Sequence, residues 1–328
     1  MREVFDSVEA MLSATGNTVT RERMDKNADS LSGSPFERVT IAGGAVIGRE
    51  DYVLKYVGHA LDWLARALGD RDCFVRTLWQ RGILDELPPQ IDHTIVAVAD
   101  TGTGAALLMR DVHEHLIPDG SVTRAQHRGF LDHLAAMHAA FWDFPEAEAA
   151  GLLPPGNRYT ALTTATGLAE PDDPVPQALG PGWAALERAA PKAYKLAAEL
   201  AERPGPLVTE LAKTPQAFVH GDWKFGNLGR HRDGRTILLD WGWPGRAAPL
   251  VDIGWYLAVN CDRLPESKED TIAAYRAALE GRGISTGQWW DRQLELALLG
   301  AFVQLGWSKT HDPAELGWWT ERITRVDL

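Results

Sequence analysis

Two short polar motifs in the second half of the chain constrain its fold and its chemistry most strongly. The first motif runs from His220 to Asn227 and reads HGDWKFGN, and the second runs from Leu238 to Gly242 and reads LLDWG. A turn signal at Gly234 separates them, and the second motif begins with the end of an apolar, strand-like run. A hairpin between the motifs would bring the side chains of Asn227 and Asp240 together.

The residue types at these positions suit phosphoryl transfer from ATP. That reaction depends mostly on positioning and on neutralising the charge that develops on oxygen atoms. Mg²⁺ prefers oxygen ligands, which Asn227 and Asp240 supply. The base that accepts a proton from a hydroxyl group must be a carboxylate within reach, and Asp222 is the only carboxylate in the first motif. A hydrolase metal site made by His220, Asp222 and Asp240 is the alternative, although further His ligands at metal spacing are missing nearby.

The motifs resemble those of the aminoglycoside phosphotransferase and choline kinase family, small-molecule relatives of the protein kinases. That family carries H-G-D-x-x-x-x-N, then an apolar strand that ends in Asp-Trp or Asp-Phe, and a further Asp about a dozen residues later, which Asp252 matches. The resemblance implies that Asp222 is the catalytic base and that Asn227 and Asp240 hold Mg²⁺. It also implies that Asp252 braces the catalytic loop and that His220 supports the loop structurally.

The resemblance implies a bilobal α+β fold of the protein-kinase type, with ATP in the cleft. The sequence pattern agrees, because strand signals dominate the first part of the chain and helical periodicity dominates the rest. We expect a strand-rich N-lobe over residues 1–111 and a mostly helical C-lobe over 112–328, which carries the catalytic loop, the metal site and the acceptor pocket. Strands are expected over 36–41, 51–57, 95–99 and 105–109, helices over 3–14, 60–80, from about 123, and over 187–203, 268–280 and 289–307, and an irregular Pro- and Gly-rich insertion over 145–185.

The nucleotide site of the N-lobe follows from the same resemblance. Lys55, in the second expected strand, corresponds to the kinase lysine that contacts the α- and β-phosphates. The loop that covers the phosphates would be residues 30–34. It lacks the glycine-rich motif of protein kinases, but its last three residues can offer backbone N–H groups to phosphate. These three residues are Ser32, Gly33 and Ser34.

Two more nucleotide contacts are expected. The adenine would bind backbone groups of the hinge between Met109 and Asp111. The helix glutamate that normally pairs with the strand lysine is missing, because no Glu lies within the thirty residues that follow Lys55. Asp72 is the best substitute by position, with Asp70 behind it, and a solvated charge on a helix surface is the equally weighted alternative for Asp72.

Composition and charge exclude several classes of protein. The chain has 328 residues, 45% hydrophobic and 24% charged, which is typical of a soluble globular protein with room for two lobes. Its net charge of −12 argues against a nucleic-acid partner, since phosphate backbones need clustered Lys and Arg. The apolar run around 296–303 is too short to span a membrane. The first residues lack the apolar core of a signal peptide, and two cysteines cannot build a disulfide framework, so a cytoplasmic location is expected.

The acceptor is expected to be a small molecule with a free hydroxyl group. Only eleven residues separate Asp240 from Asp252, too few for the peptide-docking segment of a protein kinase, and no A-P-E segment follows. A catalytically weak binding module is the other alternative, but it would have lost one of the motif residues or Lys55, and all of these are present. The sequence names neither the acceptor (an antibiotic, sugar or amino alcohol) nor the oligomeric state. The candidate pocket residues offer a stacking face or a negative charge: Trp223, Trp243, Asp262, Glu266, Trp289, Trp290, Trp307, Trp318 and Trp319.

Overall fold

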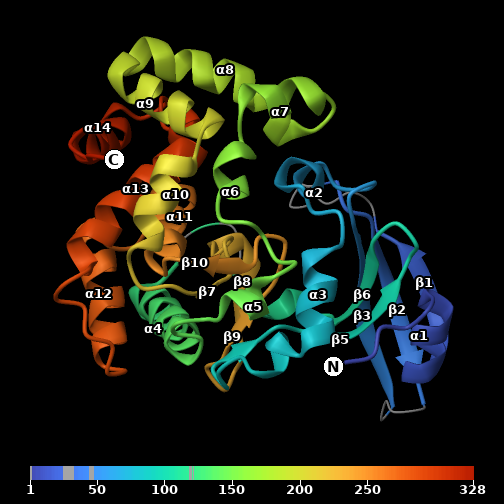
Figure 1. The fold of residues 1–328 in the computed structure, drawn as a ribbon. Coiled ribbons are helices and arrows are strands. Elements are labelled where there is room, and N and C mark those ends of the chain that lie inside the picture. Colours follow the sequence, from blue (N-terminus) through green and yellow to red (C-terminus); the bar gives the residue numbers. More distant parts are fainter. Residues whose placement is uncertain (1, 25–32, 44–47, 118–119, 121) are drawn as a thin grey trace.

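The chain forms a β-sheet region from its first part and a mostly helical region from the rest (Figure 1). The computed structural model describes residues 2–24, 33–43, 48–117, 120 and 122–328. The predicted α+β class is confirmed, with an antiparallel sheet in the N-terminal region and helices in the C-terminal part. The boundary placed at residue 111 stays a prediction.

Five antiparallel strands make the N-terminal sheet, in the order β1-β2-β3-β6-β5. Central strand β3 carries Lys55, which lies opposite Phe36 of β2 and Leu107 of β6. Strand β1 is absent from the sequence prediction, because its residues are almost all exposed and show no apolar alternation. The strands are β1 (Asn17–Arg23), β2 (Phe36–Ala42), β3 (Arg49–Val57), β5 (Ile95–Asp100) and β6 (Ala105–Arg110).

Helices cover both faces of this sheet. Helix α1 (Val8–Thr15) buries Met11 and Leu12 against one face, and α3 (Phe74–Arg81) buries its apolar side within the larger core on the other. The prediction of a single helix over 60–80 is wrong, because the helical conformation ends with α2 (Trp63–Leu68) and resumes only in α3. Gly69 ends α2 with a φ of 71°, a left-handed conformation that glycine adopts without strain.

Three pairings of short strands position the motif region. Strands β8 (Leu228–Arg230) and β9 (Thr236–Leu238) form the hairpin that the motif spacing predicts. Strand β4 (Ile91–Asp92) runs parallel to β9 and so fastens the N-terminal region to this hairpin. The third pair joins β7 (Ala217–Val219), which leads into the first motif, to β10 (Gly245–Ala247), which follows the second.

The C-terminal part consists mainly of helices. Helix α4 begins where Thr123 and Gln126 form a capping box, which satisfies backbone N–H groups at the helix start. The segment 145–185 is not irregular as expected: it contains three short helices and most of α8, despite Pro181 inside that helix. The helices are α4 (Arg124–Ala140), α5 (Glu146–Ala149), α6 (Asn157–Thr160), α7 (Thr164–Ala169), α8 (Pro174–Ala189), α9 (Pro191–Glu202), α10 (Gly205–Ala212), α11 (Leu250–Val259), α12 (Lys268–Glu280), α13 (Trp290–Leu305) and α14 (Pro313–Ile323).

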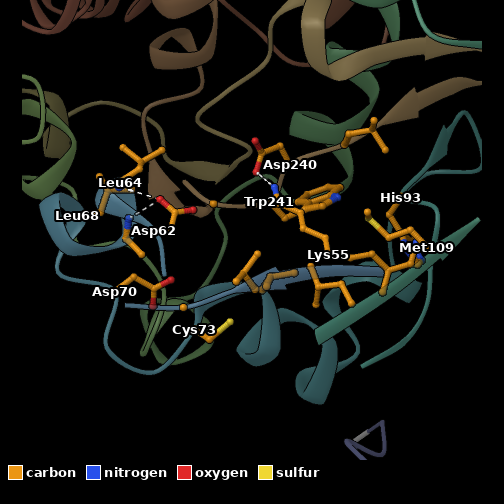
Figure 2. Close-up of a pocket in the computed structure, with 18 residues that line it drawn as sticks. Lys55, Asp62, Leu64, Leu68, Asp70, Cys73, His93, Met109, Asp240 and Trp241 are labelled. Carbon is orange, nitrogen blue, oxygen red and sulfur yellow. Dashed lines mark hydrogen bonds and ion pairs between the residues drawn. The ribbon is translucent and has the colours of Figure 1, made fainter. Parts of the chain in front are cut away.

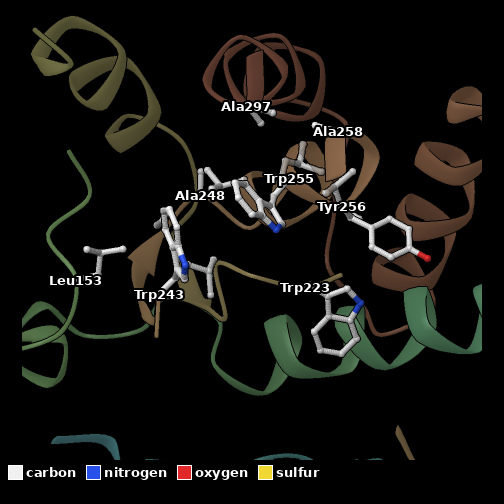
Figure 3. Close-up of a cluster of buried hydrophobic side chains, with 14 of the residues drawn as sticks. Leu153, Trp223, Trp243, Ala248, Trp255, Tyr256, Ala258 and Ala297 are labelled. Carbon is white, nitrogen blue, oxygen red and sulfur yellow. The ribbon is translucent and has the colours of Figure 1, made fainter. Parts of the chain in front are cut away.

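Helices α11 and α13 pack closely beneath the motif region. A Cβ atom on Gly254 of α11 would lie 2.7 Å from the carbonyl oxygen of Ala297 in α13, so only glycine permits this approach. Trp223, Trp243 and Trp255 belong to the cluster of buried side chains that Figure 3 shows. Among the described helices, none is long and apolar enough to span a membrane.

Candidate active site

The loop of the first motif is held from below by the buried carboxylate of Asp252. Its Oδ2 accepts the backbone N–H of His220 at 3.0 Å, and its Oδ1 accepts that of Gly221 at 2.7 Å. His138, on α4, contacts Oδ2 through Nε2 at 3.1 Å. Burial alone raises the pKa of Asp252, but these hydrogen bonds and the nearby imidazoles hold it below its ordinary value. Asp252 therefore braces the loop as an anion, the role that the resemblance implies.

His220 ties the two motifs together and is not free to bind a metal. Its Nε2 contacts the carbonyl oxygen of Leu239 at 3.1 Å, and its Nδ1 accepts the backbone N–H of Asp222 at 3.2 Å. Burial lowers the pKa of His220, so the ring is neutral, with its proton on Nε2. Both ring nitrogens are therefore used within the fold, which disfavours the alternative of a hydrolase metal site.

The carboxylate of Asp222 receives three side-chain hydrogen bonds. Its Oδ2 accepts from Nζ of Lys224 at 2.7 Å and from Nδ2 of Asn227 at 2.8 Å. Its Oδ1 accepts from the indole Nε1 of Trp255 at 2.9 Å. Sequence reasoning missed both Lys224 and Trp255. The cation two positions after the acid was a usable signal for Lys224, whereas Trp255 lies on α11 and nothing in the sequence connects it to Asp222.

The two expected metal ligands lie on neighbouring backbone segments. The N–H of Leu239 donates to the carbonyl oxygen of Asn227 at 2.9 Å, and Asp240 follows at once with a φ of 62°. Burial raises the pKa of Asp240, but Lys55 and Lys224 outweigh it and lower the pKa to about 2. Asp240 is therefore ionised at neutral pH, so its carboxylate could serve as an oxygen ligand.

This donor set fits Mg²⁺ bound together with a nucleotide. Among the described residues, no cluster of three or more His, Cys, Asp or Glu side chains could hold a metal ion alone. Mg²⁺ is commonly bound by one or two protein oxygens, by waters and by phosphate oxygens, and so needs no such cluster. The side chain of Asp240 is 37% exposed and faces the pocket described next, where phosphates could complete the coordination.

A pocket lies between the N-terminal sheet and the second motif (Figure 2). Lys55 reaches across it from β3, and its Nζ contacts Oδ1 of Asp240 at 3.0 Å. Apolar side chains of the sheet line the same pocket, and they offer a surface for a flat aromatic base. Its apolar lining includes Val57, Ile95, Leu107 and Met109.

Four of the residues expected at the nucleotide do not line this pocket, and Ser32 lies outside the described residues. Asp111 instead accepts hydrogen bonds from the backbone and ring of His113. Ser34 is buried and donates to Oδ2 of Asp62, which does line the pocket. Gly33, which precedes Ser34, has a φ of 87°. The fourth expected residue that does not line the pocket is Asp72.

The structure does not bring Asp72 to Lys55. Asp72 is exposed, whereas Asp70 is buried and lines the pocket. The reason is the helix break at Gly69: the chain turns inward at Asp70, whose carboxylate accepts the N–H of Phe74 at the start of α3 at 3.0 Å. Asp72 then lies on the outside of the turn. Asp70, two residues before the predicted Asp72, therefore lines the pocket instead of Asp72.

Most candidate acceptor residues belong to the core or to ion pairs within the fold. Trp223, Trp290 and Trp319 are buried. The carboxylate of Glu266 pairs with Arg128 and Arg124, so it is not available to a cationic acceptor. Trp243 is buried as well, and its ring lies 5.3 Å from that of Trp255, the residue that contacts the proposed base.

The protonation of Asp70 leads to a test of stability against pH. Burial raises the pKa of Asp70 to about 6, so the folded chain binds this proton more tightly than the unfolded chain does. The contribution of Asp70 to stability is therefore present at low pH and is lost as the pH rises from about 4 to about 6. Asp70→Asn keeps an oxygen acceptor for Phe74 without this loss. We expect it to add on the order of 2 kcal/mol to the unfolding free energy at pH 8 and little at pH 4.

Thermal unfolding at both pH values checks this expectation. Asp72→Asn is the matched control, because the exposed Asp72 lies only two residues away, and its Tm should be close to that of the parent at both pH values. An Asp70→Asn variant whose change in Tm is the same at pH 4 and pH 8 would contradict the assignment of a raised pKa to Asp70.

Comparison with known proteins gives the same family as the motifs. A sequence profile described as the phosphotransferase enzyme family (APH) matches residues 26–288. The structure is similar to choline kinase LicA from Streptococcus pneumoniae, with a TM-score of 0.51, 11% identity and coverage of 96% of each chain. It is also similar to spectinomycin phosphotransferase APH(9)-Ia in complex with ADP and spectinomycin, with a TM-score of 0.50, 13% identity and coverage of 94% of this chain and 90% of that one.

At these identities the structural similarity establishes the fold, and the protein-kinase-like architecture predicted from the sequence is confirmed. A search of curated proteins finds no match. The family assignment therefore rests on the sequence profile, which covers most of the chain, including both motifs and Lys55. The predicted class of enzyme, a small-molecule kinase, is confirmed as well, and the chain belongs to the phosphotransferase enzyme family.

Proposed function

We propose that this enzyme transfers the γ-phosphoryl group of Mg-ATP to a hydroxyl group of a small molecule, with Asp222 as the base. One observation carries the proposal. Asp222 contacts Asn227, the carbonyl oxygen of Asn227 accepts the N–H of Leu239 next to Asp240, and Asp240 contacts Lys55 across the pocket. A proton acceptor, two metal-ligand candidates and a phosphate-binding cation are thus connected in one site.

The nucleotide is proposed to lie in the pocket beneath β3 and β6. Lys55 would contact its phosphates, and the backbone between Met109 and Asp111 would bind the adenine. The apolar lining around Met109 supports this orientation. The segment Ser32, Gly33 and Ser34 is proposed to cover the phosphates, which the hydrogen bond from Ser34 to Asp62 in the pocket wall supports. The exposure of Asp72 favours its alternative role as a solvated charge.

Asn227 and Asp240 are proposed to hold Mg²⁺. When bound there, Mg²⁺ would neutralise charge on the phosphate oxygens of the nucleotide. Lys224 supplies a second positive charge at the same place. Burial lowers its pKa, but Asp222 and Asp240 outweigh that effect and raise it, so the ammonium group stays charged. We propose that the ammonium group of Lys224 stabilises the negative charge of the transferred phosphoryl group and also holds Oδ2 of Asp222 in place.

The acceptor is proposed to be a small molecule rather than a protein. Every segment between Asp240 and Asp252 is used by the fold: Trp241 and Trp243 are buried, β10 pairs with β7, and α11 begins at Leu250. No part of this segment is left to form a platform for a peptide. We therefore expect labelled ATP to transfer its phosphate to a hydroxylated small molecule and not to Ser or Thr residues of peptides.

The measurement is a screen of phosphate transfer and ADP release across aminoglycosides, macrolides, amino alcohols, nucleosides and sugars, with mixed peptides as the control. Efficient labelling of peptides, without a small-molecule acceptor, would overturn the proposal. Nucleotide binding without ADP release under any of these conditions would instead favour the alternative of a binding module. A cytoplasmic location and the lack of a nucleic-acid partner remain predictions from the composition.

A further inference from the structure

We propose that Trp255 is a positioning residue that makes Oδ1 the proton-accepting atom of Asp222. The inference rests on the proposed function, in which Asp222 is the base. The indole N–H of Trp255 donates to Oδ1 at 2.9 Å, and it comes from α11 rather than from the catalytic loop itself. The orientation of the carboxylate is thus set by the helical core of the C-terminal part.

The distribution of donors distinguishes the two oxygens of the carboxylate. An ionised carboxylate offers about four lone-pair positions, two on each oxygen. Among the described residues, Oδ2 accepts from Lys224 and Asn227, whereas Oδ1 accepts only from Trp255. One position therefore remains on Oδ1 for the acceptor hydroxyl. The ammonium group beside Oδ2 also repels a proton that approaches that oxygen, whereas Oδ1 has only a neutral donor beside it, so Oδ1 is the better proton acceptor.

Close packing fixes the direction of the indole N–H. Trp255 is 5% exposed, and its ring lies beside that of Trp243, with 5.3 Å between centroids (Figure 3). Trp243 in turn lies against Gly221 of the catalytic loop, where a Cβ atom would come within 2.4 Å of the Trp243 carbonyl oxygen. On the other side, Gly254 brings α11 against α13. The indole is therefore held between the loop and the core, and Asp222 cannot turn Oδ1 away without losing its hydrogen bond.

The chemical step then has a defined course. The O–H bond of the acceptor breaks and its proton moves to Oδ1 of Asp222. The oxygen of the acceptor forms a bond to the γ-phosphorus, and the bond from that phosphorus to the β–γ bridging oxygen breaks, so that ADP leaves with the electron pair. Asp222 afterwards releases the proton to solvent. Water can replace the acceptor, in which case the products are ADP and inorganic phosphate.

The kinetic test compares two buried tryptophans. Trp255→Phe removes the N–H donor and keeps most of the apolar ring. Trp319→Phe is the matched control, because this buried indole also donates to a carboxylate, Oε1 of Glu315 at 2.7 Å, but lies on α14 away from the site. We expect kcat for ADP release from Mg-ATP, with water as the acceptor, to fall about tenfold in Trp255→Phe, since the base is misplaced. KM for ATP should stay within about twofold, and Trp319→Phe should resemble the parent in both constants.

A double-mutant cycle separates positioning from a structural role. If Trp255 acts through Asp222, Trp255→Phe should lower kcat much less in an Asp222→Asn background, because there is no base left to position. A general packing defect would lower kcat by the same factor in both backgrounds. That result, or parent-like turnover of Trp255→Phe, would overturn the inference. A parent enzyme that releases no ADP with any acceptor would contradict the proposed function instead.

A spectroscopic measurement avoids both turnover and the need for a Trp255 variant to fold. The indole ¹H–¹⁵N signal of Trp255, assigned through contacts within α11, should move upfield in Asp222→Asn, since the proton then faces a neutral amide oxygen instead of a carboxylate. The signal of Trp319 should stay in place. An unchanged Trp255 signal would show that the indole does not contact the carboxylate, and the inference would fail whatever the enzyme's activity.

Discussion

Asp222→Asn is expected to fold and to bind Mg-ATP like the parent, while its kcat falls by at least ~10²-fold. The amide cannot take the proton of the acceptor hydroxyl, so the nucleophile is no longer activated. Binding should survive, because the contact of Lys55 with Asp240 and the apolar lining around Met109 do not involve the side chain of Asp222. The measurement is ADP release under saturating ATP, with nucleotide affinity determined by calorimetry.

Asp233→Asn supplies the matched control for this substitution. Asp233 lies in the turn of the β8–β9 hairpin, its side chain is 56% exposed, and an amide oxygen can still accept the backbone N–H of Arg235. This variant should have the kcat of the parent. Near-full turnover of Asp222→Asn would remove Asp222 from the role of base, and loss of activity in both variants would point to a general defect of the hairpin.

Asp240→Ala is expected to abolish Mg²⁺-dependent turnover. The substitution removes the ionised oxygen ligand, and with it most of the charge neutralisation at the phosphates. Asn227→Ala should be milder, because one neutral ligand among several is lost. The clearest readout is ATP affinity with Mg²⁺ against ATP affinity with EDTA: the parent should bind more tightly with Mg²⁺, and Asp240→Ala should show no difference.

Asp240→Asn is the control for the structural role of Asp240, since Lys55 would keep an oxygen at Oδ1 but not a charged partner. It should unfold close to the parent temperature and still lose Mg²⁺ dependence. If both Asp240→Ala and Asn227→Ala bind Mg-ATP and turn over like the parent, the assignment of these two residues to the metal is wrong.

The motif hairpin could be predicted from the sequence because its geometry is local. The spacing from Asn227 to Asp240 and the turn at Gly234 nearly determine that the backbone segments carrying the two residues pair, whatever the rest of the chain does. Strand β1 could not be predicted in the same way, because an exposed edge strand has no apolar face to produce an alternating pattern. The family and the class of enzyme followed from the motifs and are confirmed by the sequence profile.

The missed residues depend on contacts between distant segments. Trp255 meets Asp222 only because Gly254 lets α11 lie close to α13, and a tryptophan in an apolar helix otherwise looks like any core residue. The preference for Asp72 over Asp70 failed for a local reason. One left-handed glycine at position 69 reverses which acidic side chain points inward, and the apolar pattern of 60–80 gives little sign of that break.

The location of the residues that hold Asp222 in place determines which parts of this enzyme can change during evolution without disturbing it. The side chains that support the catalytic loop and the proposed base include His138 on α4, Asp252 and Trp255 on α11, and Lys224 and Asn227 in the loop itself. None of these supporting residues belongs to the helices α5 to α9. Substitutions and insertions in those helices can therefore accumulate while the proposed base keeps its orientation.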